Sequence, residues 1–231
     1  MQPAAIGKGS VGNREKSEGA GDRRIDVARR LTVFAVGAWL VAAFVAGTLG
    51  VVNEPGRPPL VLAGFLAVPI LGFVLWYWAS PSFRAFTETI PLSLLVGSHL
   101  WRFVGLGFVI AWLAGALPAG FGIPEGFGDI IAAAGALILL PRVRKGTASR
   151  GWLLAWNAFG FLDLLSAIAV GLGFSESAVG LLHTATASTK LMVTFPVSLI
   201  PTFFVPLFLL VHALTFRRVA HLGGGSHAVS R

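Results

Sequence analysis

Residues 90–117 read IPLSLLVGSHLWRFVGLGFVIAWLAGAL, an almost unbroken apolar run with an arginine near its middle. A helix needs about 20 predominantly apolar residues to cross a bilayer, and this run exceeds that length. The sequence therefore predicts a membrane-spanning helix that carries Arg102 and, three residues earlier, His99 inside the membrane. Because an ionisable group at that depth is costly, its presence indicates a partner within the protein and, by default, a functional role.

The composition of the whole chain fits the same class of protein. Hydrophobic residues make up 55% of the 231 residues and charged residues 12%, whereas soluble domains are about 45–50% apolar and about 25% charged. Such a low charge content at this length favours a multi-pass membrane protein. The chain has no cysteine, which excludes disulfides, thiolate metal sites and cysteine nucleophiles.

Six apolar segments follow a polar start of the chain. They are 31–52, 60–79, 90–117, 124–140, 152–173 and 191–216. Five have the length of a spanning helix, and the fourth reaches it only if Glu125 and Asp129 lie in its first turns. These runs are too long and too evenly apolar for the strands of a membrane barrel. We therefore predict an all-α integral membrane bundle of six transmembrane helices over residues 31–218.

Basic residues gather on one side of this predicted topology. All but three of the 18 Lys and Arg residues fall in the two tails or in the loops on the side of the tails; the exceptions are Arg57, Lys190 and Arg102. This asymmetry predicts that both termini are cytoplasmic, at a bacterial inner membrane. It also attributes the net charge of +8 to topology and to contact with anionic lipids, and not to nucleic acid. Residues 1–30 and 219–231 are polar enough to be expected as disordered tails.

Arg102 and Asp163 are expected at the same depth on different helices. Each lies about 17 Å from the cytoplasmic end of its predicted helix, at about 1.5 Å per residue. An unpaired arginine at the centre of a bilayer costs at least about 2.5–3.5 kcal/mol. We therefore predict that the two side chains form an ion pair that faces the inside of the bundle. Gly160 and Ser166 flank Asp163 in a stripe of small residues that would let another helix approach closely.

Two further polar side chains on these helices join the candidate ligand- or proton-binding residues. His99 shares the face of Arg102 and lies about one turn closer to the cytoplasm. Asn157 lies closer still to the cytoplasm, but about 120° around its helix from Asp163. We therefore expect Asn157 to face a different neighbour from Asp163.

Three candidates are expected nearer the two membrane surfaces. Glu125 and Asp129, four residues apart, form an acidic pair at the predicted outer mouth, where Asp129 could also simply cap the fourth helix. His212 is expected only about 6 Å inside the cytoplasmic end of the sixth helix, a depth that also suits an interface residue. With these groups the sequence predicts polar positions at the outer rim, the midplane and the inner third of the membrane.

The sixth apolar segment is interrupted by prolines, namely Pro196, Pro201 and Pro206. Each removes a backbone donor and strains the helix at the carbonyl four residues earlier. Broken backbone inside a membrane is tolerated where neighbours or a cavity satisfy its polar groups. We expect Ser198 and Thr202, one turn apart, to do part of this.

Three short stretches of the central third are RFVGLGF (102–108), GALPAGF (115–121) and PEGFGD (124–129). Their pattern resembles a family of uncharacterised bacterial multi-pass membrane proteins of similar size. The resemblance covers about 30 residues, with weaker similarity in the fifth and sixth helices. It implies that Arg102 and the turn at Gly128 and Asp129 belong to one shared signature, and it implies no activity.

Transport or passage of a small ligand or of protons is the function that this pattern favours most. Depth-matched charges, a broken sixth helix and polar groups near both membrane surfaces would provide a path. Against it, the six segments show no obvious inverted repeat, which many transporters have. A homo-oligomer would supply further polar groups if one chain has too few.

Three other functions stay open. A structural or accessory subunit would use the Arg102–Asp163 pair only to hold two helices in register. An intramembrane enzyme acting on a lipid or isoprenoid could use Asp163 and His99 as acid and base, although the chain carries no recognised nucleophile or metal motif. A b-type haem or quinone redox subunit could use His99 and His212 as haem ligands, but their predicted depths differ. We predict no metal and no cofactor, with haem b as the alternative.

Overall fold

The computed structural model describes residues 8–184 and 187–221, with side chains for 19–184 and 187–220. Among these residues there is no strand, and six helices are long and apolar enough to cross a membrane. The predicted all-α bundle of six transmembrane helices is therefore confirmed, and the protein is a multi-pass membrane protein. Of the tails predicted at residues 1–30 and 219–231, the parts 1–7 and 222–231 lie outside the described residues.

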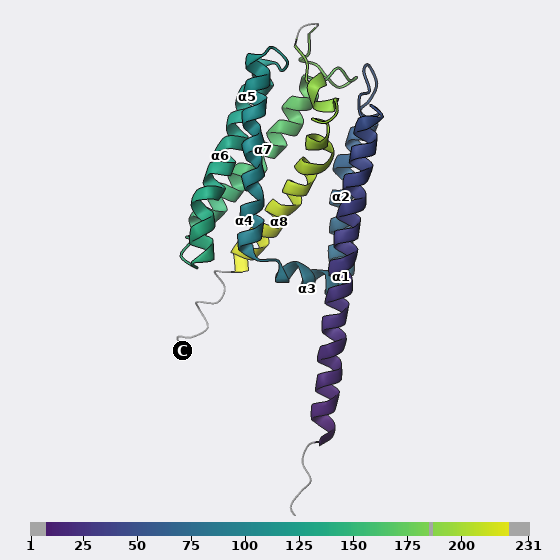
Figure 1. Ribbon diagram of the computed structural model, residues 1–231, viewed down its shortest axis with the longest axis vertical. Helices are drawn as coiled ribbons and strands as arrows, with labels where there is room; N and C mark the ends of the chain where they lie inside the picture. Colours follow the sequence, from purple (N-terminus) through teal and green to yellow (C-terminus); the bar gives the residue numbers. More distant parts are fainter. Residues whose placement is uncertain (1–7, 185–186, 222–231) are drawn as a thin grey trace, which may run out of the picture.

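The helices run up and down through one bundle (Figure 1). In chain order the elements are α1 (Lys8–Thr48), α2 (Leu60–Ala79), α3 (Pro81–Thr89), α4 (Leu92–Ser98), η1 (His99–Val104), α5 (Gly105–Leu113), α6 (Ala119–Arg144), α7 (Arg150–Gly173), η2 (Lys190–Val193), η3 (Ile200–Phe204) and α8 (Val205–His221). The third span consists of α4, η1 and α5 in direct succession. We call the end of the bundle where α3 lies and α8 ends the terminal end, and the opposite end, with the segment 174–199, the long-loop end (Figure 1).

Two spans extend beyond the segments that hydrophobicity delimits. α6 begins at Ala119, directly after Pro118, whose backbone is extended. The predicted start at residue 124 is wrong, because Pro124 is accommodated inside the second turn of the helix. α8 continues to His221, beyond the predicted limit at residue 216. Both extensions place polar residues deeper in the bundle than the sequence predicts.

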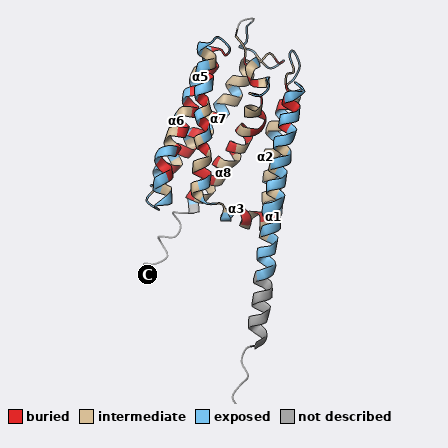
Figure 2. Cartoon of the chain, in the orientation of Figure 1, coloured by how far each residue is buried: buried red, intermediate tan, exposed pale blue. Residues whose placement is uncertain are grey.

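α1 begins at Lys8, well before the predicted span at residue 31. Composition favours an irregular tail here, whereas the structure continues the helix through this polar segment. Extending an existing helix is easy, because each added residue gains a hydrogen bond without a new nucleation step. From Gly19 to Arg30 nearly all side chains are exposed (Figure 2), so tertiary packing holds this extension only at Ile25 and Ala28, which pack with Phe83 and Phe86 of α3. Its disorder in solution stays a prediction.

Burial is uneven across the six spans (Figure 2). In the most apolar 18-residue segment of α6, half of the residues are buried, whereas the buried share of the corresponding segment is 17% in α1 and 6% in α2. Buried side chains gather where the third span, α6, α7 and α8 face one another, while α1 and α2 expose most of their surface. The protein-facing core, and with it the candidate site, therefore lies among those four spans.

Large apolar side chains fill the space between α4, α6, α7 and α8 toward the terminal end. We call this set the terminal cluster; it consists of Val96, Ala136, Leu139, Leu140, Leu153, Trp156 and Val219. The indole Nε1 of Trp156 donates to the carbonyl of Ala132 at 2.8 Å, so the cluster contains no unsatisfied indole donor. Lipid tails are as apolar as these residues, so close packing, not removal from water, holds the cluster together.

The sixth span starts with η3, a π-helical turn, before it becomes the regular helix α8. Pro206 has no N–H group, so the carbonyl of Thr202 lacks its usual helical donor. The indole Nε1 of Trp39 in α1 donates to this carbonyl at 2.9 Å. The hydroxyl of Thr202 in turn donates to the carbonyl of Ser198 at 2.6 Å. The predicted proline break is thus present, and α1 satisfies one of the backbone groups that it frees.

The short helix α3 lies across the terminal end and connects α2 to the third span (Figure 1). The side chain of Ser80 caps it by accepting from the N–H of Phe83 at 3.2 Å. The ring of Phe83 stacks on Trp76 of α2, with centroids 4.1 Å apart. Phe83 and Phe86 are buried together with Ala28 of α1. α3 therefore joins α1 and α2 to the rest of the bundle at this end.

Candidate functional site

The third span carries His99 and Arg102 on a tighter turn than an α-helix. η1 is a 3₁₀ helix, which has about 3.0 residues per turn, so side chains three positions apart point in the same direction. In a regular α-helix the same two side chains would diverge by about 60°. Both residues are at most 1% exposed. The 3₁₀ turn therefore aims both side chains at the interior of the bundle.

Each nitrogen of the Arg102 guanidinium has an acceptor on another helix. Nε donates to Oδ1 of Asp129 in α6 at 2.7 Å, and Nη2 donates to Oδ2 of Asp163 in α7. Nη1 donates to the carbonyl of Gly160 at 3.0 Å and lies 3.5 Å from Nε2 of His212 in α8. We call these five residues the arginine centre. The predicted Arg102–Asp163 ion pair is present, and Asp129 is a second carboxylate partner.

Two glycines make room for the arginine centre. A Cβ atom at Gly128 would overlap the carboxylate of Asp163. A Cβ atom at Gly160 would lie 2.7 Å from Cε1 of His212 and 2.9 Å from Nη1 of Arg102. Small residues at helix contacts let backbones approach closely. The predicted stripe around Gly160 is thus the place where α7 comes close enough for its backbone to accept from the guanidinium.

His212 is fixed by Asn157 of α7. Nδ1 of His212 lies 2.8 Å from Oδ1 of Asn157, and Nδ2 of Asn157 donates to the carbonyl of His212 at 3.0 Å. Because an amide oxygen can only accept, Nδ1 carries the hydrogen, and in the neutral ring Nε2 is left as an acceptor facing Arg102. Asn157 thus faces α8 while Asp163 faces the third span, as their angular separation predicts.

The ring of His99 packs against that of His212, with centroids 4.1 Å apart and planes tilted by 31°, and contacts Trp156 and Phe208 with centroids at 5.2 Å each. Neither ring nitrogen of His99 has a hydrogen-bond partner among the described residues. Rings with centroids this close leave no space for a porphyrin between them, so the two histidines do not fit a haem iron held from opposite sides. Among the described residues no group of three or more His, Asp or Glu side chains is arranged to hold a metal ion.

Glu125 lies one turn of α6 beyond Asp129, toward the long-loop end. Its Oε1 accepts from the hydroxyl of Ser166 in α7 at 2.9 Å. Its Oε2 has no hydrogen-bond partner among the described residues, although the residue is only 1% exposed. A buried carboxylate oxygen without a donor is costly, which marks Glu125 as a group that a ligand, a proton or water would satisfy.

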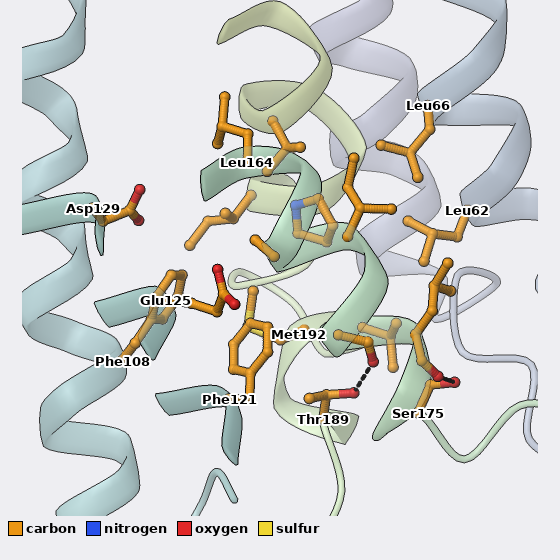
Figure 3. A pocket seen from close by; sticks show the side chains of 18 residues that line it. Leu62, Leu66, Phe108, Phe121, Glu125, Asp129, Leu164, Ser175, Thr189 and Met192 are labelled. Atoms are coloured by element: carbon orange, nitrogen blue, oxygen red, sulfur yellow. Dashed lines mark hydrogen bonds between the residues drawn. The ribbon is translucent and has the colours of Figure 1, made fainter. Parts of the chain in front are cut away.

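Glu125 and Asp129 line a cavity of about 70 Å³ between the arginine centre and the long-loop end. Its walls come from α2, α5, α6, α7 and α8, and from η2 and η3. Figure 3 shows the carboxyl group of Glu125 pointing in among Phe121, Leu164 and Met192. The site thus combines a buried charged centre with an adjoining, mainly apolar cavity.

Three positions predicted from helix ends are wrong. Because α6 begins at Ala119, Asp129 lies about 15 Å inside it and pairs with Arg102, so it neither caps the helix nor lies at a mouth. Glu125 is likewise buried and not at the rim. His212 lies about 14 Å from the end of α8 at His221, which brings it to the depth of His99. The predicted difference in depth between the two histidines is therefore also wrong.

Two uncharged contributors were not predicted as part of the site. One is the backbone carbonyl of Gly160, and the other is the indole of Trp156, which lies edge-on to His99 with an interplanar angle of 82°. Trp156, Gly160 and Asp163 are spaced by four and three residues, so they share one face of α7. That spacing is a signal in the sequence from which Trp156 could have been assigned to the site.

Comparison with known proteins places the chain in a family. A family model described as "Domain of unknown function (DUF8737)" matches residues 59–220. These residues include all spans from α2 to α8 and every member of the arginine centre, while α1 lies outside the match. No curated protein and no solved structure matches the chain. Because the matched residues make up more than half of the chain, the protein belongs to this family of unknown function.

Proposed function

We propose that this protein passes protons, alone or together with a small ligand, across a membrane through the arginine centre. The observation that carries the proposal is the position of that centre between two unlike flanks. Unfilled space adjoins it on the side of the long-loop end, and tightly packed side chains of the terminal cluster close it on the other side. A buried charged site with an approach from one side at a time is what alternating access requires.

The charge of the buried groups supports proton or cation binding. Glu125, Asp129 and Asp163 lie near one guanidinium, and the described ion pairs of these carboxylates involve only Arg102. With all three ionised, the group carries an excess of negative charge in surroundings of low dielectric constant, which is unfavourable. Binding a proton or a cation relieves that excess. Intramembrane carboxylates and histidines in such chains are typical of proton relays.

We further propose that the terminal end faces the cytoplasm of a bacterium, at the inner membrane. Basic side chains of several helices lie at that end, including Arg84, Arg150 and Arg218, as the positive-inside rule expects. A hollow between α1 and α3 is lined by Arg23, Arg24 and other residues, and its basic groups suit the head groups of anionic lipids. Protease protection of epitope tags at either terminus of the protein in inverted vesicles tests this orientation.

Proton flux into liposomes tests the proposed function. Purified protein is reconstituted into vesicles that contain a pH-sensitive dye, and a potassium diffusion potential, negative inside, drives protons inward. We expect faster acidification than in protein-free vesicles. Glu125→Gln keeps the shape of the side chain but removes its charge, and we expect it to lower the flux at least about tenfold, since a relay group is lost.

Glu88→Gln is the matched control, because Glu88 is exposed in α3 and pairs with Arg217 far from the cavity. This variant is expected to conduct like the wild type. A wild-type flux no greater than that of empty vesicles would contradict proton passage. Equal flux in Glu125→Gln and the wild type would exclude Glu125 from the path.

A structural role is the second candidate, because every nitrogen of the Arg102 guanidinium is paired and four spans meet there. Replacing a complete buried ion group by well-packed apolar residues is often neutral or stabilising. A triple variant with leucine at Arg102, Asp129 and Asp163 that is as stable as the wild type, together with no wild-type flux, would favour this role over transport.

A further inference from the structure

The wall of the cavity beside the arginine centre contains one fully buried side-chain oxygen without a hydrogen-bond partner among the described residues. Besides the two carboxylic acids, its polar lining side chains are Ser175 and Thr189. Both hydroxyls are already used: Ser175 donates to the carbonyl of Leu172 at 2.7 Å, and Thr189 donates to that of Gly171 at 2.7 Å. Only Oε2 of Glu125 is buried in the cavity wall without a hydrogen-bond partner among the described residues.

The remainder of the cavity wall is apolar. It is formed by the aromatic rings of Phe108 and Phe121, by aliphatic side chains such as Leu164, and by the thioether of Met192 (Figure 3). Cavities that bind small molecules typically have such a lining, with a few polar groups that fix the orientation of the ligand. A ligand that fills this one therefore has a hydrocarbon body and a single polar group that reaches Glu125.

The polar group of the ligand is defined by what Glu125 lacks. An ionised carboxylate only accepts hydrogen bonds, so the complementary group is a donor. Asp129 also lines the cavity, and it shares its guanidinium partner with Asp163. A positively charged donor is favoured over a neutral one because it also reduces the excess of negative charge, and an anion is disfavoured.

We propose that the cavity binds an amphipathic organic ammonium ion, with its hydrocarbon part between α2, α5, α7 and η3 and its ammonium group on Oε2 of Glu125. Glu125 is then the residue that selects charge, and the apolar wall selects the hydrocarbon. Such an ion is the ligand of the proposed transport site, and its biological role depends on the proposed function. The binding itself does not depend on transport.

Three six-carbon probes that differ in charge test the proposal. Hexylammonium, hexanol and hexanoate are titrated separately into the purified full-length protein in detergent, and each dissociation constant is obtained from the rise in melting temperature with probe concentration. We expect hexylammonium to bind at least about tenfold more tightly than hexanol, because hydrogen bonds to charged groups are the stronger ones. Hexanoate is expected to bind least.

Two variants separate the charge from the space. Glu125→Gln is expected to remove the preference for hexylammonium over hexanol while hexanol binding is retained. Ala167→Phe places a ring in the cavity, which Ala167 lines, and is expected to abolish binding of both probes. Glu88→Gln, at the exposed end of α3, is the control for loss of a glutamate charge and is expected to bind like the wild type.

Each contrary result has a defined meaning. Equal affinities for hexylammonium and hexanol in the wild type would overturn the assignment of a cation and leave a purely apolar cavity. Unchanged hexylammonium binding in both Glu125→Gln and Ala167→Phe would place binding elsewhere. Charge-selective binding in a protein without proton flux would support the ammonium site and contradict the proposed transport. Failure of the binding proposal can therefore be distinguished from failure of the transport proposal.

Discussion

The two flanks of the arginine centre share the third span, α6, α7 and α8 but are packed in opposite ways. Toward the terminal end, α6 and α7 supply Leu139, Leu153 and Trp156, which interlock in the terminal cluster. Toward the long-loop end, α7 instead supplies Ala167 and Gly171, and unfilled space remains. Along α7 the difference therefore comes from side-chain size.

The backbone of the sixth span accentuates this asymmetry. On the side of the terminal cluster α8 is a regular helix, whereas on the cavity side η3 is π-helical and Pro201 lines the cavity. π-helical turns occur frequently at functional sites, and they alter the direction of the side chains that follow. The closed flank is thus held by close packing of apolar side chains, whereas glycine, alanine and proline keep the open flank unfilled. Substitutions can therefore alter each flank separately.

The largest effect is expected from removing the charge that both flanks enclose. Arg102→Leu leaves Asp129 and Asp163 buried without their partner, which typically costs about 3–5 kcal/mol. We expect a large fall in the melting temperature and in the yield of folded protein in detergent. Arg144→Leu, at an exposed position at the end of α6, is the control and should remain close to the wild type. Similar stability of the two variants would show that the ion pairs contribute little.

A smaller loss of stability is expected from adding a methyl group at a glycine that makes room for the arginine centre. Gly128→Ala forces the new methyl group into the Asp163 carboxylate, and overpacking of this kind costs about 1–3 kcal/mol. Gly72→Ala is the matched control, since nothing lies within 4 Å of its Cβ position in α2. Alanine is the better helix former there by up to about 1 kcal/mol. Thermal unfolding of both variants should therefore shift in opposite directions.

The sequence predicts the spans and the Arg102–Asp163 pair because both depend on local rules. Span length follows from hydrophobicity, and the depth of both residues follows from the rise per residue of helices with well-defined starts at the terminal end. Hydrophobicity also selects the right class of fold without any tertiary information. These parts of the structure need no knowledge of how the helices contact one another.

The parts that the sequence does not predict depend on helix ends and tertiary contacts. Asp129 is displaced from the predicted rim because Pro124, which usually starts a helix, lies inside α6. His212 is misplaced because α8 continues past the apolar segment into Arg217 and Arg218. A proline and a basic pair are ordinary boundary signals, and here the packed neighbours override them.

The accessibility of the two flanks can be compared directly, because the chain has no cysteine of its own. Met192 lines the cavity and Leu139 lies in the terminal cluster, and they are 8% and 7% exposed. We expect Met192→Cys to react about tenfold faster than Leu139→Cys with aminoethyl methanethiosulfonate, since thiols sealed in apolar packing are inert. Mass spectrometry after timed quenching measures both rates. Equal rates at these equally buried positions would show that the terminal cluster opens as readily as the cavity.

The smallest expected effect concerns the attachment of α1 to the open flank. Trp39→Phe removes the indole donor from the Thr202 carbonyl, which Pro206 leaves without a helical partner, and one such hydrogen bond contributes about 1 kcal/mol. Trp78→Phe, at a 78% exposed position in α2, is the control for loss of an indole. We expect a small drop in the melting temperature for Trp39→Phe only, together with faster labelling of Met192→Cys in that background, because η3 is freed beside the cavity. Unchanged labelling would mean that α1 contributes to stability but does not hold the open flank in place, which fits its position outside the family match.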